Sequence, residues 1–207
     1  MPAKTFGLAV FIAFALLAEP AFAHHVMGGR MPEAFSDGFL SGLGHPVIGL
    51  DHFAAVVAVG CLAAVHRNAP MLAIGFVLAM IAGVAAHLQG ATVPGAEILV
   101  ALTVIGLGVA LLSRRQMPVG AALGLFAAAG LIHGYALGES IYGAEQTPLY
   151  AYLLGLAVIQ TAVALAAMSV TQVIAKKAGD LSPVRLVGAG IAGIGFAALM
   201  QQLIPGA

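Results

Sequence analysis

The stretch His45-Pro46-Val47-Ile48-Gly49-Leu50-Asp51-His52 places two imidazoles and a carboxylate directly before an apolar run, Phe53 to Val65, that carries no charge. Such a run predicts a membrane-spanning helix, so Asp51 and His52 are expected at or just inside a membrane boundary. An ionisable group at that depth is costly and marks a polar binding site or pathway. Imidazole and carboxylate are also ligands that nickel, cobalt and zinc accept. The stretch therefore predicts a metal site at a membrane.

The composition also indicates a membrane protein. Of the 207 residues, 61% are hydrophobic and 8% are charged, and the mean hydropathy is +1.06, whereas a soluble domain has about 25% charged residues. The net charge of zero argues against a nucleic-acid partner. The single cysteine, Cys61, excludes an internal disulfide framework and a multi-cysteine zinc site. We expect Cys61 to serve in packing.

Residues 1–23 resemble a signal peptide. Lys4 supplies the positive charge, residues 6–18 the apolar segment and Ala21-Phe22-Ala23 a cleavage site. The alternative is an uncleaved first span, but the segment is short and Glu19-Pro20 interrupts it. We therefore expect cleavage after Ala23.

Cleavage there leaves one mature domain, residues 24–207, with His24 and His25 at its N-terminus. A terminal histidine offers an α-amine and an imidazole to a metal, and His25 adds a second ring. The alternative is that two polar residues merely follow a cleavage site.

Six apolar runs follow, and each approaches or exceeds the ~20 residues that cross the hydrocarbon core. The expected fold is an all-α integral membrane protein with six transmembrane helices. Pro70, Pro94, Pro118, Pro148 and Pro183 mark the starts of the second to sixth. Residues 34–44 are too short to span and are expected to form an interfacial or re-entrant helix. The expected spans are residues 46–65, 70–89, 95–113, 117–138, 148–175 and 183–203.

The distribution of basic residues predicts the orientation. With a cleaved signal the mature N-terminus is outside, and the loops after the first, third and fifth spans are cytoplasmic. Those loops contain six of the basic residues, whereas the outer segments contain only Arg30, which is a clear positive-inside bias. The expected location is the bacterial inner membrane, with both termini on the periplasmic side. The six are Arg67, Arg114, Arg115, Lys176, Lys177 and Arg185.

This topology sorts most histidines and several carboxylates to the outer ends of the spans. A histidine that only fills a core has no reason to prefer one leaflet, so the sorting predicts an outward-facing cation site. His66, beside Arg67, is instead expected in a solvated loop. The outer candidates are His45, Asp51, His52, His87, Glu97, His133 and Glu139.

Each candidate also has a structural alternative. His45 and His52 are two helical turns apart, roughly 10 Å along the axis, too far to share an ion unless Pro46 and Gly49 break the helix. Broken helices are one way in which transporters expose binding groups. Asp51 is either a ligand or a partner that orients an imidazole. Among the rest, His45 is alternatively a helix cap, His87 an interfacial residue and Glu97 a helix N-terminal charge.

The segment HPVIGLDHFAAVVAVG, residues 45–60, resembles the first signature of the HupE/UreJ family of nickel and cobalt permeases, an HPxxGxDH motif. A second signature, approximately HGxAHGxE, matches residues 133–139, HGYALGE, in part. The departure is Leu137, where that pattern has a second histidine. The resemblance implies metal roles for His45, Asp51, His52, His133 and Glu139, and His87, His24 or His25 are candidates to replace the missing imidazole.

The expected function is therefore secondary uptake of Ni²⁺ or Co²⁺ as a transported substrate, with no tightly bound cofactor. The chain has no GxxxxGK[ST] pattern for a nucleotide, no HExxH helix and no nucleophile near a histidine, so we do not expect an enzyme. The alternatives are a membrane metal-binding accessory protein for metalloenzyme maturation and a haem-binding membrane protein.

Overall fold

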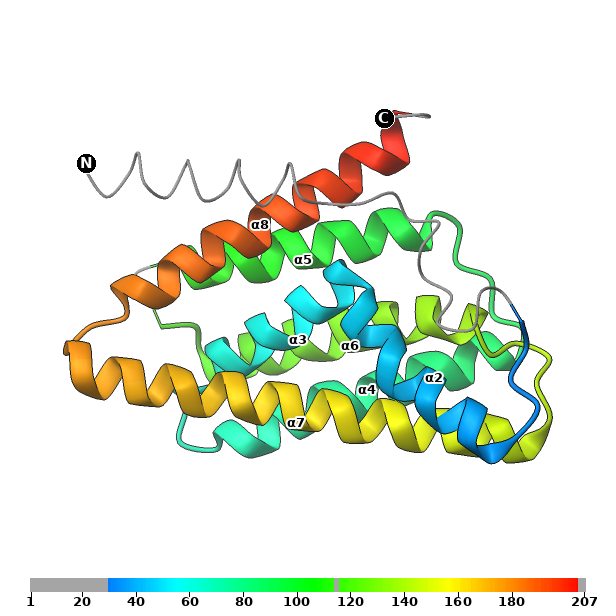
Figure 1. The fold of residues 1–207 in the computed structure, drawn as a ribbon. Helices are drawn as coiled ribbons and strands as arrows, with labels where there is room; N and C mark the ends of the chain where they lie inside the picture. Colours follow the sequence, from blue (N-terminus) through cyan, green and yellow to red (C-terminus); the bar gives the residue numbers. More distant parts are fainter. Residues whose placement is uncertain (1–29, 114–115, 205–207) are drawn as a thin grey trace.

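The computed structural model describes residues 30–113 and 116–204, and every regular element in that part of the chain is a helix (Figure 1). The expected signal peptide, His24 and His25 lie outside the described residues, as do Arg114 and Arg115. The helices are α2 (Phe35–Ile48), α3 (Leu50–Ala63), α4 (Ala69–Leu88), α5 (Ala96–Leu112), α6 (Val119–Glu139), α7 (Gln146–Ala178) and α8 (Ser182–Leu203).

Helices α4 to α8 begin and end within three residues of the apolar runs that predicted them. Prolines mark several starts, as expected. Pro70 and Pro183 lie in the first turns of α4 and α8, and Pro118 is the residue before α6. Proline is tolerated there because the first backbone N–H groups of a helix have no partner within it.

The first span differs from the prediction of a short interfacial or re-entrant helix at 34–44 followed by a span over residues 46–65. Helix α2 continues through His45 and Pro46 to Ile48, Gly49 is extended (φ −71°, ψ 98°), and α3 leaves at 79° to α2. Pro46 has no N–H to give to the carbonyl of Gly42, so α2 loses a hydrogen bond and ends within a turn. The break that would let His45 and His52 approach one another, which the sequence left open, is therefore present at Gly49.

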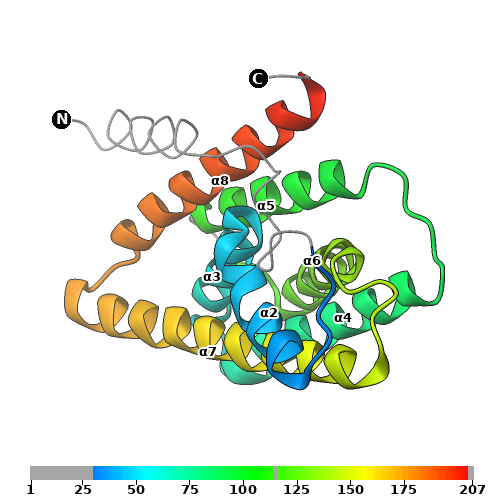
Figure 2. The same cartoon turned by 45° about the vertical axis from the view of Figure 1, so that its right-hand side comes forward.

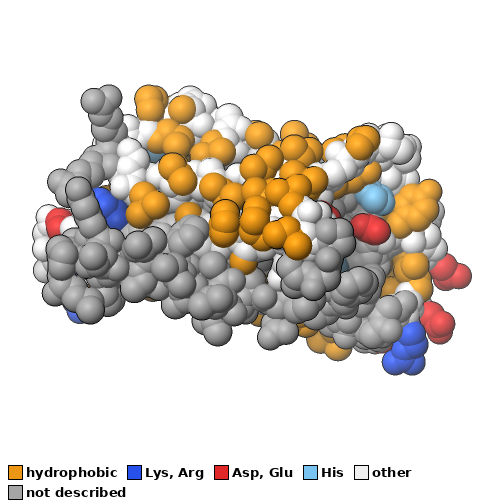
Figure 3. All heavy atoms as spheres, turned by 90° about the horizontal axis from the view of Figure 1, so that it is seen from above, with side chains coloured by type: hydrophobic (Ala, Val, Ile, Leu, Met, Phe, Trp, Pro, Cys, Tyr) orange, Lys and Arg blue, Asp and Glu red, His pale blue; other side chains and the backbone are white. Residues whose placement is uncertain are grey.

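The helices fit a multi-pass membrane protein. Four of them, α4, α6, α7 and α8, are long and apolar enough to cross a membrane, and the bent pair of α2 and α3 makes a fifth candidate span. Helix α5 is apolar but shorter, with 17 residues. Hydrophobic side chains dominate the middle of the visible face in Figure 3, and Lys, Arg, Asp and Glu lie toward its ends. The structure therefore supports several spans without fixing their number at six.

Three helix pairs pack closely: α4 with α6, α5 with α8, and α2 with α7 (Figures 1 and 2). Small residues at the contacts let backbones approach, as at membrane helix interfaces generally. A Cβ added at Gly134 would overlap the backbone of Met80, and one at Gly188 would lie 2.7 Å from Cβ of Leu111. The small-residue face of α8 therefore packs within the chain. Helix α3 contacts α7, α5 and α8, which places its first turn inside the bundle.

Candidate metal site

Three histidines from three different helices meet inside the bundle. His45 on α2, His52 on α3 and His133 on α6 are 7%, 6% and 0% exposed. The ring centroids of His45 and His52 are 6.4 Å apart, and those of His52 and His133 are 4.9 Å apart. In one continuous helix, His45 and His52 would be about 10 Å apart along the axis. The bend at Gly49 therefore brings together two imidazoles that the sequence separates by two turns.

This cluster lies well below one end of the bundle. His133 precedes the end of α6 at Glu139 by six residues, and Tyr152 follows the start of α7 at Gln146 by six. Six residues correspond to about 9 Å of helix. The ring of Tyr152 meets that of His45 edge-on, with centroids 6.5 Å apart. Two helices thus independently give the same depth, inside the apolar part of the bundle.

Asp51 orients the imidazole of His52. Its Oδ1 accepts a hydrogen bond from the backbone N–H of His52 at 2.8 Å and lies 2.9 Å from Nδ1 of the same ring. An ionised carboxylate only accepts, so Nδ1 carries the proton. In the neutral ring Nε2 then holds a lone pair, and this atom is buried with no hydrogen-bond partner among the described residues. Of the two roles open to Asp51, the geometry favours the orienting one.

His133 provides a second buried ring nitrogen that could donate a lone pair to a metal ion. Its Nε2 lies 3.0 Å from Oγ1 of Thr103 on α5, and its Nδ1 is buried without a hydrogen-bond partner in the described part of the chain. Metal–imidazole bonds are about 2.0–2.1 Å long, so two rings on one ion at 90–110° have centroids about 4.5–5.2 Å apart. The observed 4.9 Å between His52 and His133 lies in that range.

The remaining carboxylate candidates lie at the end of the bundle nearest the cluster, where α6 ends and α5 begins; this end is called the mouth. Glu139 is exposed at the end of α6. Glu97 is half-buried in the first turn of α5, as the helix-terminus interpretation predicts.

His87 lies among tyrosines. Its ring meets those of Tyr135 and Tyr142, with centroids 4.6 and 5.6 Å apart, and its buried Nδ1 has no hydrogen-bond partner among the described residues. Across residues 30–113 and 116–204, no three His, Cys, Asp or Glu side chains are gathered closely enough to hold an ion. The structure places His45, Asp51, His52 and His133 near one another, with His ring centroids 4.9 and 6.4 Å apart, but not closely enough for three of them to hold one ion. Glu139 lies apart, exposed at the end of α6.

Leu137 occupies the position of the second histidine of the family pattern. It is fully buried and lies one turn beyond His133, on the same face of α6. Its carbonyl accepts a hydrogen bond from the hydroxyl of Tyr152 at 3.0 Å. At this position the chain therefore has an apolar contact in the core.

Two polar residues beside the cluster escaped the sequence interpretation. Thr103 contacts His133 directly. Gln160 on α7 is 1% exposed, and its side-chain amide has no hydrogen-bond partner among the described residues. It lies beside Pro46 and Phe53 at the bend between α2 and α3. Thr103 is the one polar side chain of α5 after Glu97, which is a weak signal. Gln160 is one of several polar residues in α7, so its position in the sequence does not single it out.

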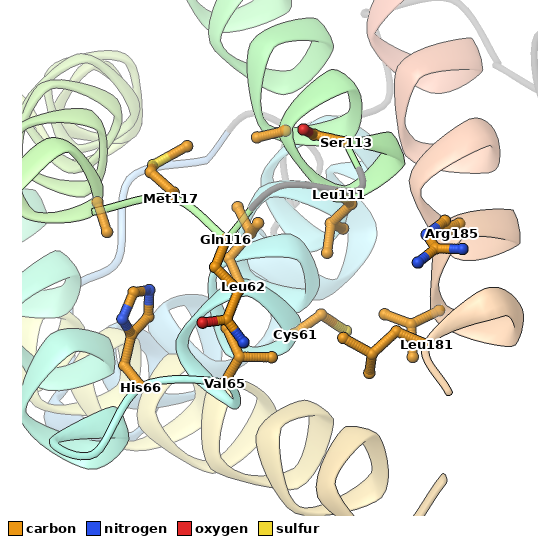
Figure 4. A pocket seen from close by; sticks show the side chains of 13 residues that line it. Cys61, Leu62, Val65, His66, Leu111, Ser113, Gln116, Met117, Leu181 and Arg185 are labelled. Atoms are coloured by element: carbon orange, nitrogen blue, oxygen red, sulfur yellow. The ribbon is translucent and has the colours of Figure 1, made fainter. Parts of the chain in front are cut away.

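A separate cavity of about 70 Å³ lies at the opposite end of the bundle (Figure 4). Its lining includes Cys61, His66 and Met117. His66, expected in a solvated loop, lies in the turn after α3 and is half-buried against this cavity. Cys61 is buried and has a free thiol, in agreement with a packing role.

Comparison with known proteins identifies the family. The family model described as HupE / UreJ protein matches residues 12–198. Protein HupE of Rhizobium leguminosarum bv. viciae is 34% identical over 126 residues, which are 60% of this chain and 63% of that relative. No solved structure matches the chain. Because the family model covers nearly the whole sequence, the chain belongs to the HupE/UreJ family.

Proposed function

We propose that this protein is a secondary permease that takes up Ni²⁺ or Co²⁺, with His52 and His133 as the core of its ion site. The observation that carries the proposal is the pair of buried imidazole nitrogens, Nε2 of His52 and Nδ1 of His133, that have no hydrogen-bond partner among the described residues. A buried polar atom without a partner is costly. A bound divalent ion satisfies both atoms at once, and nickel and cobalt accept imidazole.

Membership of the HupE/UreJ family supports this function, because the family is associated with nickel and cobalt transport. The proposal extends to the remaining ligands. The ring centroids of His45 and His52 are 6.4 Å apart. This equals the largest separation at which two imidazoles can bind one metal ion, about 6.4 Å when the rings lie on opposite sides of it. His87 and Glu139 lie toward the mouth and are proposed as residues that the ion meets on entry.

The proposed topology has six spans, with α2 and α3 together as the first and α5 as the third. The 17 residues of α5 extend about 26 Å, close to the ~30 Å of the hydrocarbon core. Arg67, Lys176, Lys177 and Arg185 lie in or beside connections at the end opposite the histidines. The positive-inside rule then places the histidine cluster on the outer side of the bacterial inner membrane.

This orientation gives uptake a driving force. The membrane potential favours entry of a cation by about 2.3 kcal/mol per charge per 100 mV, or about 4.6 kcal/mol for a divalent ion at 100 mV. No nucleotide is then required for accumulation.

The test is uptake of radiolabelled nickel and cobalt by cells that express the wild type, His52→Ala or His66→Ala, in a host that lacks partner genes. We expect His52→Ala to abolish uptake while the protein still reaches the membrane. His66→Ala is the matched control, because it removes an imidazole at the other end of the bundle and should keep uptake. Full uptake by His52→Ala would refute the site. Metal binding without uptake by the wild type would favour the accessory-protein alternative, and a Soret band in the purified protein would favour haem.

A further inference from the structure

Thr103 has a defined hydrogen-bond direction. Its hydroxyl Oγ1 lies 2.7 Å from the carbonyl oxygen of Val100 and 3.0 Å from Nε2 of His133. A carbonyl oxygen only accepts, so the single hydroxyl proton of Thr103 points to Val100. The lone pairs of Oγ1 are then left for His133, and Nε2 of that ring must be the donor.

This direction fixes which nitrogen of His133 faces the ion. With the proton on Nε2, the lone pair of the neutral ring is on Nδ1, the buried nitrogen without a hydrogen-bond partner. His52 has the opposite arrangement, since Asp51 holds its proton on Nδ1 and leaves the lone pair on Nε2. In each ring, one nitrogen therefore carries the proton and has a hydrogen-bond partner, Asp51 for His52 and Thr103 for His133. The other nitrogen of each ring carries the lone pair and has no partner among the described residues.

We propose that Thr103 is a positioning residue that holds His133 in the Nε2–H form, so that Nδ1 is the nitrogen that ligates the transported ion. This inference rests on the proposed function. A hydrogen-bond partner on the second nitrogen fixes the tautomer and orientation of a ligating histidine, and its loss typically costs 10–100-fold in metal affinity. A hydroxyl that merely filled space in the core would have neither effect.

The direct test measures the tautomer of His133 in the full-length, metal-free protein in detergent or nanodiscs. Nitrogen NMR of ¹⁵N-histidine-labelled protein separates protonated from unprotonated ring nitrogens, and His133→Asn identifies the signals of His133. We expect the Nε2–H form in the wild type and a mixture or the Nδ1–H form in Thr103→Val, which has the same shape without the hydroxyl. A wild-type ring protonated on Nδ1 would overturn the inference, as would an unchanged tautomer in Thr103→Val.

A second measurement titrates Co²⁺ or Ni²⁺ into the same proteins. We expect the affinity of Thr103→Val to fall 10–100-fold and that of Thr103→Ser to stay within about threefold of wild type, because serine restores the hydroxyl. Thr171→Val is the control, since Thr171 is a buried threonine on α7 near the other end of the bundle. Equal affinities in the wild type and Thr103→Val would overturn the role of Thr103 alone, whereas a wild type that binds neither ion would overturn the proposed function with it.

Discussion

Replacing Gly134 by alanine tests how the contact between α4 and α6 holds His133 in place. Gly134 follows His133 directly and packs on the backbone of Met80. An added Cβ would overlap the carbonyl oxygen of Met80 and lie 2.6 Å from its carbonyl carbon, whereas ordinary contact begins at 3.4 Å. Because these are backbone atoms and not the end of a flexible side chain, the two helices must separate locally, at an overpacking cost of about 1–3 kcal/mol.

The same displacement reaches the candidate site. The separation displaces the backbone of α6 next to His133 and therefore disturbs the 3.0 Å contact between His133 and Thr103, because a hydrogen bond weakens steeply when its length and angle change. We therefore expect Gly134→Ala to lower both the apparent Tm and the metal affinity, the latter by at least tenfold.

Gly124→Ala is the matched control. Gly124 is on the same helix, and a Cβ there meets nothing within 4 Å. This variant should gain about 0.5–1 kcal/mol from helix propensity and keep wild-type uptake. Thermal unfolding in detergent and radiolabelled nickel uptake, measured on both variants, provide the comparison. Equal stability and equal uptake in Gly134→Ala and Gly124→Ala would refute the reasoning.

Three further predictions concern the bend and the mouth of the site. Gln160→Leu removes a buried amide that has no hydrogen-bond partner among the described residues. Because such a group costs about 1–3 kcal/mol of stability, the variant should have a higher apparent Tm. A lower Tm would show that the amide has a partner in the native protein. Pro46→Ala removes a bias of about 3 kcal/mol against a continuous helix and should weaken metal binding by moving His45 away from His52, and unchanged affinity in a Co²⁺ titration would contradict this. His87→Ala should reduce nickel uptake less than His133→Ala does, because the ring of His87 lies among tyrosines near the mouth, and the reverse order would place the ion at His87.

Much of the fold could be predicted from the sequence because the solvent is apolar. A helix that crosses lipid must be long and apolar. A helix tolerates proline at its start but not in its interior, so Pro70, Pro118 and Pro183 mark where helices begin. The boundaries of α4 to α8 followed from these two rules. The broken first helix was also foreseeable, since Pro46 removes a backbone donor. Gly49 was also named as a residue that could break it, but that α2 continues as a helix through Pro46 to Ile48 before the break could not be foreseen.

The site could be predicted only in part. His45, Asp51, His52 and His133 carry charge or imidazole in apolar surroundings, so each was conspicuous in the sequence. Glu139 was equally conspicuous, but it is exposed at the mouth.

Thr103 and Gln160 gave no comparable signal. A neutral polar residue hardly changes the hydropathy of a helix, and only packing decides whether its side chain faces the core or the lipid. Hydrogen-bond partners of a metal ligand are therefore the part of such a site that a single sequence conceals.

X-ray absorption spectroscopy of Ni²⁺ or Co²⁺ bound to the purified full-length protein tests the central claim most directly. If Nε2 of His52 and Nδ1 of His133 both ligate the ion, the wild-type spectrum will show at least two imidazoles in the first coordination shell. His52→Ala and His133→Ala will then each lose one imidazole, and His66→Ala will lose none. A wild-type shell without imidazole, or one that neither substitution changes, would contradict the account.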